Sequence, residues 1–343
     1  MATARVTRGR RYHRPMRRAL RSGGFVLLVA AAFAVGWVRL PYYSMGAGPS
    51  REITPLIHVD GAPTYGSSGH LVMTTIRFTR TTALGALVAW IDPETAVVGD
   101  EVVFPPGLSP SEEERRAVSQ MDQSKIDAAV VVLSEVASYP KDHGPGALIE
   151  QVGEGCPAHR RLFPGDLILR IAGEEVDSRR EASRLIEAVP PGRPIAFRVQ
   201  ADGATHDVSV ARGRCPGIEE PLIGISLVAA FPFDITIESG DVGGPSAGLM
   251  WAVGLYDLLT PGDLTSGRTI AGTGTIDLEG NVGPIGGIRD KVVAARDTGA
   301  DILLVPERNM AEIRGVDRGD LRVIAVSTFD DAIGALRSSN ATA

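Results

Sequence analysis

The sequence predicts an α+β protein that carries an inserted β-rich domain and begins with one membrane-spanning helix. Three observations lead to this fold class. In the last third of the chain, strand-like stretches alternate with stretches of helical apolar spacing, as is typical of sheets covered by helices. Residues 140–214 hold several short strand-like stretches and a single helical one. Residues 23–38 are apolar and uncharged.

The N-terminal segment is predicted to be a membrane anchor. Residues 1–22 contain eight arginines and no acidic residue, and an uncharged run of 17 residues follows from Ser22 to Val38. Such a run is at the short end for a spanning helix. The arginines keep the N-terminus in the cytoplasm and send the body outward, and Trp37 supplies an aromatic residue for the far interface.

A cleaved signal peptide is the alternative, because Ala-x-Ala frames occur around residues 30–34. The uncleaved anchor is favoured since the apolar run continues past these frames. In either case the body lies outside the cytoplasm, and the anchor makes the chain a single-pass protein of the cell membrane.

The exported body is acidic. The whole chain has 343 residues and a formal net charge of −6, but beyond residue 22 it carries 27 basic and 41 acidic groups. This charge argues against nucleic acid as a partner. No Cys/His spacing is typical of a metal site, and no cofactor is expected. Cys156 and Cys215 form one disulfide or stay as two buried thiols, and both possibilities remain open.

Residues 41–138 are expected to contain strands and one long helix. A linker over 41–63 leads into a strand over 67–79, and residues 83–91 form a second strand or a short helix. Ser109, Pro110 and Glu112 have the spacing of a capping box with proline at the first helical position. The helix is predicted to continue to about Ala137.

Ser246 is the candidate nucleophile. A strand-like stretch from Phe231 leads into glycines and Pro245, and Ser246 then opens an apolar helix. The simplest interpretation is a helix N-cap. The Gly-Pro-Ser-Ala-Gly frame favours more, because it lets backbone N–H groups approach a hydroxyl at the positive end of a helix. No histidine follows Ser246, which excludes the α/β-hydrolase triad in its usual chain order.

Lys291 is the candidate base. The chain has 35 basic residues, of which only Lys125, Lys141 and Lys291 are lysines. Arginine cannot deprotonate in a protein, whereas a buried lysine can act as a base. Lys291 lies on the apolar face of a predicted helix with Ile288 and Val292. A lysine that only covers core with its stem is the alternative, but arginine would serve that role equally well.

The serine and lysine segments together resemble the Lon protease domain. GGPSAG and the lysine of PIGGIRDK, 45 residues later, are similar to the Ser–Lys dyad of that family, and GTGTIDLEGNVGPIGG is similar to the segment between them. The resemblance implies that Thr273 orients the lysine. It also implies that the strand over 67–79 and the helix near residues 120–133 open the same domain. The sequence departs from the family at Gly243, Thr236 and Glu238, which concerns the substrate side.

Residues 140–214 resemble a PDZ domain of the HtrA-like bacterial kind. The matching parts are the glycine-led strand at Gly146, the Pro164-Gly165-Asp166 turn and the strand that follows it. A PDZ domain binds an extended peptide at a sheet edge. The alternative is a β-rich spacer without a ligand, since no loop upstream of Gly146 is suited to a carboxylate.

The order of parts resembles the YlbL-like family of PDZ–Lon-type proteases. The resemblance implies an ATP-independent serine endopeptidase in which Ser246 attacks, Lys291 moves the proton, and backbone N–H groups of Gly244 and Ser246 hold the oxyanion. No lysine follows a glycine as a P-loop requires, so no nucleotide is expected. The expected substrates are unfolded or flexible polypeptides, and a homo-oligomeric ring is implied.

Two alternatives stay open: a catalytically silent, anchored PDZ scaffold, and a protease that cuts one signalling partner. The predicted domains are a cytoplasmic N-terminus (1–22), a transmembrane anchor (23–40), the first part of the Lon-type domain (41–138), a PDZ domain (139–214), the catalytic part of the Lon-type domain (215–338) and a tail (339–343).

Overall fold

A computed structural model describes residues 36–92, 94–104, 109–201 and 203–340. These residues form two compact units. The N-terminal unit contains residues 36–46 and 78–103, and the large unit contains residues 47–77 and those from 104 onward. Most of the predicted anchor over 23–40 lies outside the described residues. Within the described ranges, no helix has the length and apolar character that crossing a membrane requires.

The N-terminal unit is a three-stranded sheet with two short helices. Its strands have the order β5-β1-β6, and its elements are β1 (Arg39–Ala47), β5 (Ile76–Thr82), α2 (Ala83–Ile91), β6 (Ala96–Gly99) and α3 (Asp100–Val103). The segment 83–91, expected as a strand or a short helix, is a helix. Thr82 caps it, because the Thr82 hydroxyl accepts a hydrogen bond from the Gly85 N–H at 3.1 Å.

A five-stranded sheet organises the large unit. Its strands follow the order β2-β4-β16-β19-β20: β2 (Arg51–Glu52), β4 (His70–Met73), β16 (Thr269–Gly272), β19 (Ile302–Pro306) and β20 (Arg322–Val326). All of them are parallel except β2, which pairs antiparallel to β4. A mostly parallel sheet needs cover on both faces, and this sheet has it.

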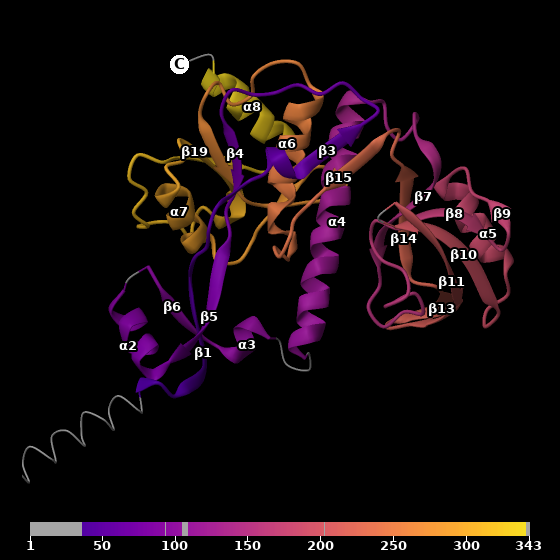
Figure 1. Ribbon diagram of the computed structural model, residues 1–343, viewed down its shortest axis with the longest axis horizontal. Helices are drawn as coiled ribbons and strands as arrows, with labels where there is room; N and C mark the ends of the chain where they lie inside the picture. The colour runs from indigo at the N-terminus through magenta and orange to yellow at the C-terminus, as the bar shows by residue number, and fades with distance from the viewer. Residues whose placement is uncertain (1–35, 93, 105–108, 202, 341–343) are drawn as a thin grey trace, which may run out of the picture. The chain divides into compact units, whose positions relative to one another are not determined.

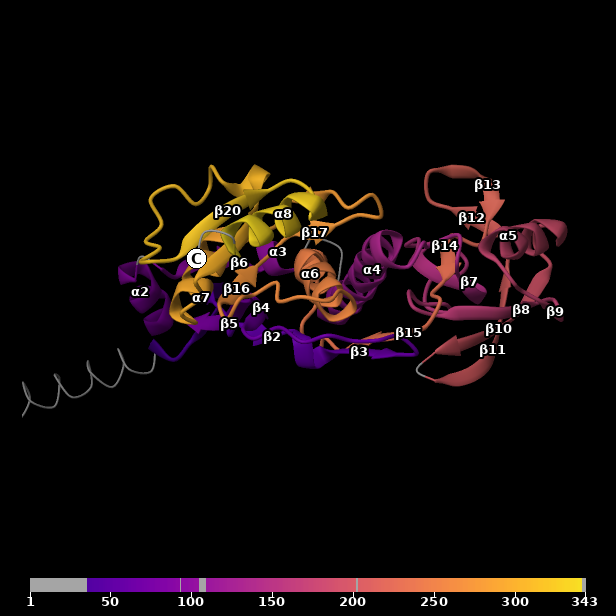
Figure 2. The same cartoon turned by 90° about the horizontal axis from the view of Figure 1, so that it is seen from above.

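Alternate residues of each strand enter different cores. Leu71, Ile270 and Leu304 join one core with helices α4 (Pro110–Val136), α6 (Gly248–Leu259) and α8 (Phe329–Asn340). Val72, Ala271 and Leu303 join a second core with helix α7 (Ile288–Asp297). The period of two along a strand therefore places α6 and α7 on opposite faces of the sheet, as Figures 1 and 2 show.

Smaller elements complete this part of the large unit. They are η1 (Thr54–Leu56), β3 (Ile57–Asp60), β15 (Asp234–Ile237), η2 (Pro245–Ala247), β17 (Thr275–Ile276), β18 (Val282–Gly283) and η3 (Glu307–Asn309). β3 pairs with β15, and β17 pairs with β18, each antiparallel.

The strand predicted over 67–79 is two strands, β4 and β5. The chain changes partners between them, because the Thr74 N–H donates to the Gly272 carbonyl at 3.5 Å whereas the Thr75 carbonyl accepts from Gly48 at 2.9 Å. The helix predicted after Ser109 is α4, and its capping box is present, with the Ser109 side chain on the Glu112 N–H and the Glu112 side chain on the Ser109 N–H.

A second sheet, with one helix, forms the PDZ-like part of the large unit. The strand order is β11-β10-β8-β7-β14, with β9 beside β8 and the hairpin β12-β13 apart. The elements are β7 (Gly144–Val152), β8 (Leu167–Ile171), β9 (Glu174–Glu175), α5 (Arg179–Ala188), β10 (Pro194–Ala201), β11 (Ala204–Ala211), β12 (Gly213–Cys215), β13 (Ile218–Leu222) and β14 (Ile225–Ala230).

The boundary expected at residue 214 does not match this sheet. The catalytic part was expected to begin at residue 215, but β14, which lies in that range, pairs antiparallel with β7 along its whole length. Ile223 also belongs to the PDZ-like core. The expectation was wrong because strand pairing between distant residues is not visible in a local pattern.

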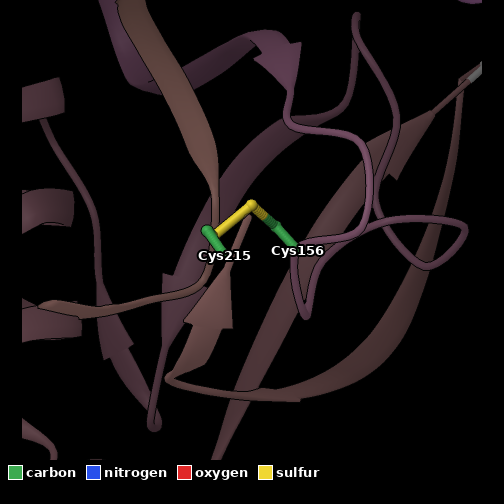
Figure 3. The surroundings of a disulfide bond; sticks show 2 residues. All are labelled: Cys156 and Cys215. Carbon is green, nitrogen blue, oxygen red and sulfur yellow. A yellow bond between two sulfur atoms is a disulfide. The ribbon is translucent and has the colours of Figure 1, made fainter. Parts of the chain in front are cut away.

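Cys156 and Cys215 form a disulfide within the PDZ-like part (Figure 3). It joins residues 59 positions apart and ties the turn after β7 to the end of β12. Gly224 allows this close approach, because a Cβ there would lie 2.1 Å from the Cys156 Cβ. Of the two possibilities left open by the sequence, the structure has the disulfide.

Replacing both cysteines with alanine is expected to destabilise the PDZ-like part by about 2–4 kcal/mol, because the disulfide closes a long loop in the unfolded chain. Urea denaturation of the full chain, with and without reductant, measures the change. Reductant should shift the wild-type transition toward that of the double variant and leave the variant unchanged. Equal transitions for both proteins in the absence of reductant would contradict this.

Candidate active site

Ser246 lies in the loop between β15 and α6. The loop turns at Gly240 and Gly244, both with positive φ, which glycine adopts without the cost of a Cβ. Ser246 occupies the 3₁₀ turn η2, and α6 begins two residues later, at Gly248. Ser246 is the N-cap of neither helix, because Gly244 holds that position for η2 and Ala247 holds it for α6. The N-cap interpretation therefore does not describe this serine.

Lys291 lies on the inner face of α7 and reaches the serine. Its Nζ lies 2.6 Å from the Ser246 Oγ and 2.9 Å from the Thr273 Oγ1. Only 2% of Lys291 is exposed. The other two lysines are elsewhere: Lys125, for example, pairs with Asp122 at 2.9 Å.

Thr273 forms hydrogen bonds with both Ser246 and Lys291. It follows the last residue of β16, so it sits at the carboxyl end of a central parallel strand, where sites in such sheets are usually found. Its Oγ1 contacts the Lys291 amine and also donates to the Ser246 carbonyl at 3.0 Å. Gly274 donates its N–H to the same carbonyl at 2.9 Å. The position of Ser246 is thereby fixed relative to the strand.

Burial lowers the pKa of Lys291 to about 8. The cause is loss of water around the ammonium form, which a buried amine can relieve by releasing its proton. An amine with this pKa is substantially neutral in mildly alkaline solution. It can then accept a proton from a hydroxyl at hydrogen-bonding distance.

Gly244 does not match its expected role. The sequence analysis assigned its N–H, with that of Ser246, to an oxyanion site. In the structure the Gly244 N–H donates to the Ala117 carbonyl of α4 at 2.7 Å. That hydrogen bond holds the serine loop against α4, so Gly244 is not available to an oxyanion in this conformation. Ser246 remains as the predicted backbone donor.

Helix α4 supports the serine loop through residues that the sequence did not single out. The Ser124 hydroxyl donates to the Pro245 carbonyl at 3.1 Å. Ser124 also contacts the start of α6, because a Cβ on Gly248 would lie 2.5 Å from its Oγ and 3.1 Å from the Ile276 backbone nitrogen. Nothing in the local pattern of α4 indicates these contacts, since they join residues more than 100 positions apart.

A pocket of about 470 Å³ opens in the PDZ-like part, between α5 and the strands β13 and β14. Its charged lining is mixed, with Arg179, Arg180 and Arg212 beside Glu187 and Glu220, and the apolar start of β14 completes it. None of the residues around Ser246 lines this pocket. Across the described residues, no group of three or more His, Cys, Asp or Glu side chains is arranged to hold a metal ion.

Comparison with known proteins identifies the part of the chain that carries this site. Residues 233–337 match the Lon protease (S16) C-terminal proteolytic domain. These residues therefore resemble a Lon-type proteolytic domain, and they are called the Lon-type domain below. The range contains Ser246, Thr273 and Lys291, and with them β15, α6, α7 and the last three strands of the five-stranded sheet.

Curated relatives of the Lon-type domain are themselves Lon proteases. The chain is 43% identical over 95 residues to Lon protease of Phenylobacterium zucineum and 38% identical over 94 residues to that of Campylobacter concisus. These matches cover 27% and 26% of this chain. A match to Lon protease of Methanosphaera stadtmanae is 27% identical and covers 50% of this chain.

The chain spans only a small part of these relatives, with 12%, 11% and 18% of their lengths covered. The resemblance to a Lon-type protease that the sequence indicated is confirmed for the proteolytic domain. Among solved structures, the PDZ domain of an SdrC-like protein from Listeria innocua has 26% identity and a TM-score of 0.22, covering 24% of this chain and 92% of that one.

Gly248→Ala is expected to destabilise the Lon-type domain by about 1–3 kcal/mol, because the added Cβ would overlap the Ser124 side chain and the Ile276 backbone. Gly334→Ala is the matched control. Gly334 is also inside a helix but has open space around it, so its replacement should be neutral or stabilising by up to about 1 kcal/mol. Thermal unfolding of both variants measures the difference, and equal effects would contradict the close approach of α4 to α6.

Proposed function

We propose that this chain is an ATP-independent, membrane-anchored serine endopeptidase in which Ser246 and Lys291 form the catalytic dyad. The observation that carries the proposal is the 2.6 Å contact between the Lys291 Nζ and the Ser246 Oγ, made by an amine whose pKa burial lowers to about 8. A lysine that only covered core with its stem would leave its amine at the surface.

In the first step the neutral Lys291 amine takes the proton of the Ser246 hydroxyl as the oxygen attacks the peptide carbonyl carbon. The resulting oxyanion is held by backbone N–H groups, among which we include that of Ser246. Lys291 then gives its proton to the leaving amine as the peptide bond breaks, and an ester to Ser246 remains. Lys291 then takes a proton from water as the water oxygen attacks the ester carbon, and it returns this proton to the Ser246 oxygen as the ester bond breaks and the carboxylic acid product leaves.

Thr273 acts as the positioning residue of this dyad. The Thr273 Oγ1 accepts a hydrogen bond from the Lys291 amine and donates to the Ser246 carbonyl. Rotation of the lysine away from the serine would break the first of these bonds. The hydroxyl therefore limits the amine to orientations that suit proton transfer.

The substrates we propose are unfolded or flexible segments of extracytoplasmic proteins. β14 forms an edge of the PDZ-like sheet in the described chain, and its residues Ile225 and Leu227 line the pocket beside it. An extended polypeptide can pair with such an edge. Arg179 and Arg180 in the pocket lining favour an acidic segment or a terminal carboxylate.

Export and anchoring are proposed from residues 1–38, with the eight arginines on the cytoplasmic side. The disulfide between Cys156 and Cys215 supports export, because such bonds persist in oxidising compartments. The homo-oligomeric ring that the Lon resemblance implies is also part of the proposal.

Ser246→Ala and Lys291→Arg are each expected to lower peptide-bond hydrolysis by at least about 10³-fold, because the first removes the nucleophile and the second keeps the charge but removes the base. The full chain in detergent is incubated with an unfolded protein such as casein, without nucleotide, and new amino termini are counted. Lys125→Arg is the matched control and should hydrolyse casein at the wild-type rate.

Equal turnover by the wild type and both site variants would contradict the dyad. An absence of turnover in every preparation, together with retained binding of peptides, would instead favour the anchored scaffold.

The rate of hydrolysis is expected to rise with pH, with half of the maximal kcat/KM near pH 8. Lys291 must be neutral to accept a proton, and burial lowers its pKa to about 8. The pH dependence of kcat/KM between pH 6 and pH 10 measures this. A rate that falls over the same range would be contrary to the role of Lys291.

Asp127→Asn is the control for this pH profile, because burial, and next the charge of Glu150, raise the pKa of Asp127 to about 8 as well. The folded-state pKa of Asp127 lies above its ordinary value of 3.8, so its contribution to stability is lost as pH rises toward 8. Asp127→Asn should raise stability at pH 9 and leave the activity profile unchanged. Loss of the profile in this variant would assign the titration to Asp127.

A further inference from the structure

Helix α2 of the N-terminal unit presents an apolar stripe to the outside. Leu84, Leu87, Val88 and Ile91 follow the i, i+3, i+4, i+7 spacing of one helix face, and each is exposed. Such a face normally points into a core. Here the opposite side, with the buried Ala89, rests on the unit instead.

The exposure is large for side chains of this kind. Trp90 is 82% exposed and Ile91 is 73% exposed. From Ala83 to Ile91 the helix contains no charged or polar residue. Protein-docking surfaces usually surround an apolar centre with a polar rim, and within α2 there is none.

The end of the N-terminal apolar run lies directly beside this helix. Trp37 and Val38, the last residues of that run, are 67% and 52% exposed. The Val38 carbonyl accepts a hydrogen bond from the Ala83 N–H at 3.2 Å, where α2 begins. A Cβ on Gly36 would lie 3.5 Å from the Leu84 Cβ. The last residues of the apolar run therefore lie beside the start of α2.

We propose that α2 lies in the membrane interface, with its apolar stripe and Trp90 inserted at the boundary between lipid headgroups and acyl chains. The nine residues of α2 extend about 14 Å, which is about half the hydrocarbon thickness, so the helix lies along the membrane surface and does not cross it. Tryptophan is enriched at this depth, and an in-plane helix binds through its buried apolar area.

This inference adds a second membrane contact to the anchor of the proposed function, and the two can fail separately. The anchor depends on residues before Gly36, whereas the second contact depends on α2. The full chain has three tryptophans, and Trp251 is fully buried in the Lon-type domain. In a Trp37→Phe variant, Trp90 is therefore the tryptophan that lipid can reach.

The experiment uses the full-length Trp37→Phe variant in phosphatidylcholine vesicles whose acyl chains carry bromine, a quencher of tryptophan fluorescence. We expect the Trp90 emission to be quenched, and the quenched fraction to disappear when Trp90→Phe is added. Leu87→Asp with Ile91→Asp should remove the quenching to the same extent, because charges on the stripe oppose insertion.

Val118→Asp with Phe163→Asp is the matched control. Val118 and Phe163 are similarly exposed apolar residues, 51% and 52%, but they belong to the large unit. Their replacement should leave the Trp90 quenching unchanged. Quenching lost equally in both double variants would overturn the assignment of the contact to α2.

Alkaline carbonate washing of the same vesicles tests the anchor on its own. Vesicles that retain the protein while Trp90 stays unquenched would overturn the α2 contact and leave the anchor intact. Quenched Trp90 in protein that the wash removes would support α2 and contradict the anchor. A blue-shifted Trp90 emission without bromine quenching would mean that protein covers the stripe, and would overturn the proposal.

Discussion

A single buried amine constrains the Lon-type domain. Lys291 is almost wholly enclosed, and burial opposes its charged form, so the amine needs polar partners that do not require that charge. The hydroxyls of Ser246 and Thr273 are such partners, because each can donate to the neutral amine or accept from the protonated one. Bringing them together requires the loop before α6, the end of β16 and the inner face of α7 to meet at one edge of the sheet. The same enclosure that costs free energy on folding lowers the pKa of the amine to about 8.

Helix α4 is the element that connects this edge to the rest of the large unit. Two adjacent residues of α4 form hydrogen bonds with different parts of the large unit. Gln123 donates to Glu150 of β7 at 2.7 Å, and Ser124 donates to the Pro245 carbonyl, next to Ser246. One turn further on, Asp127 is buried near Glu150, and one of its carboxylate oxygens has no hydrogen-bond partner in the described chain. Glu150 of the PDZ-like sheet and the carbonyl beside the serine are therefore bonded to two consecutive residues of one helix. Because the hydrogen bonds are short-range, a shift of α4 by a fraction of an ångström is enough to alter them.

The sequence predicts those parts of the fold and of the site that depend on residues close together in the chain. The scarcity of lysine pointed to Lys291, because a chain that uses arginine almost everywhere needs a reason for the exception. The capping box marked the start of α4, and the glycine-rich frame marked Ser246. Pairings between distant residues could not be predicted: residues 225–230 were placed in the catalytic part although they pair with β7, and the Gly244 N–H was assigned to an oxyanion although it bonds to Ala117. The division of residues 41–138 between two units was likewise invisible, since the break between β4 and β5 falls inside one continuous strand-like pattern.

The N-terminal unit and the large unit are each built from separate stretches of the chain. The chain leaves the N-terminal unit after Gly46, forms β2, η1, β3 and β4 of the large unit, and returns to the N-terminal unit at Phe78 before leaving it again after Val103. Three covalent connections therefore join the two units. The short strands β2 and β4 are held at both ends, and β4 is the neighbour of β16, whose last residue precedes Thr273. Because each connection is a continuous piece of chain, the N-terminal unit cannot separate from β2 and from β4, the strand beside β16.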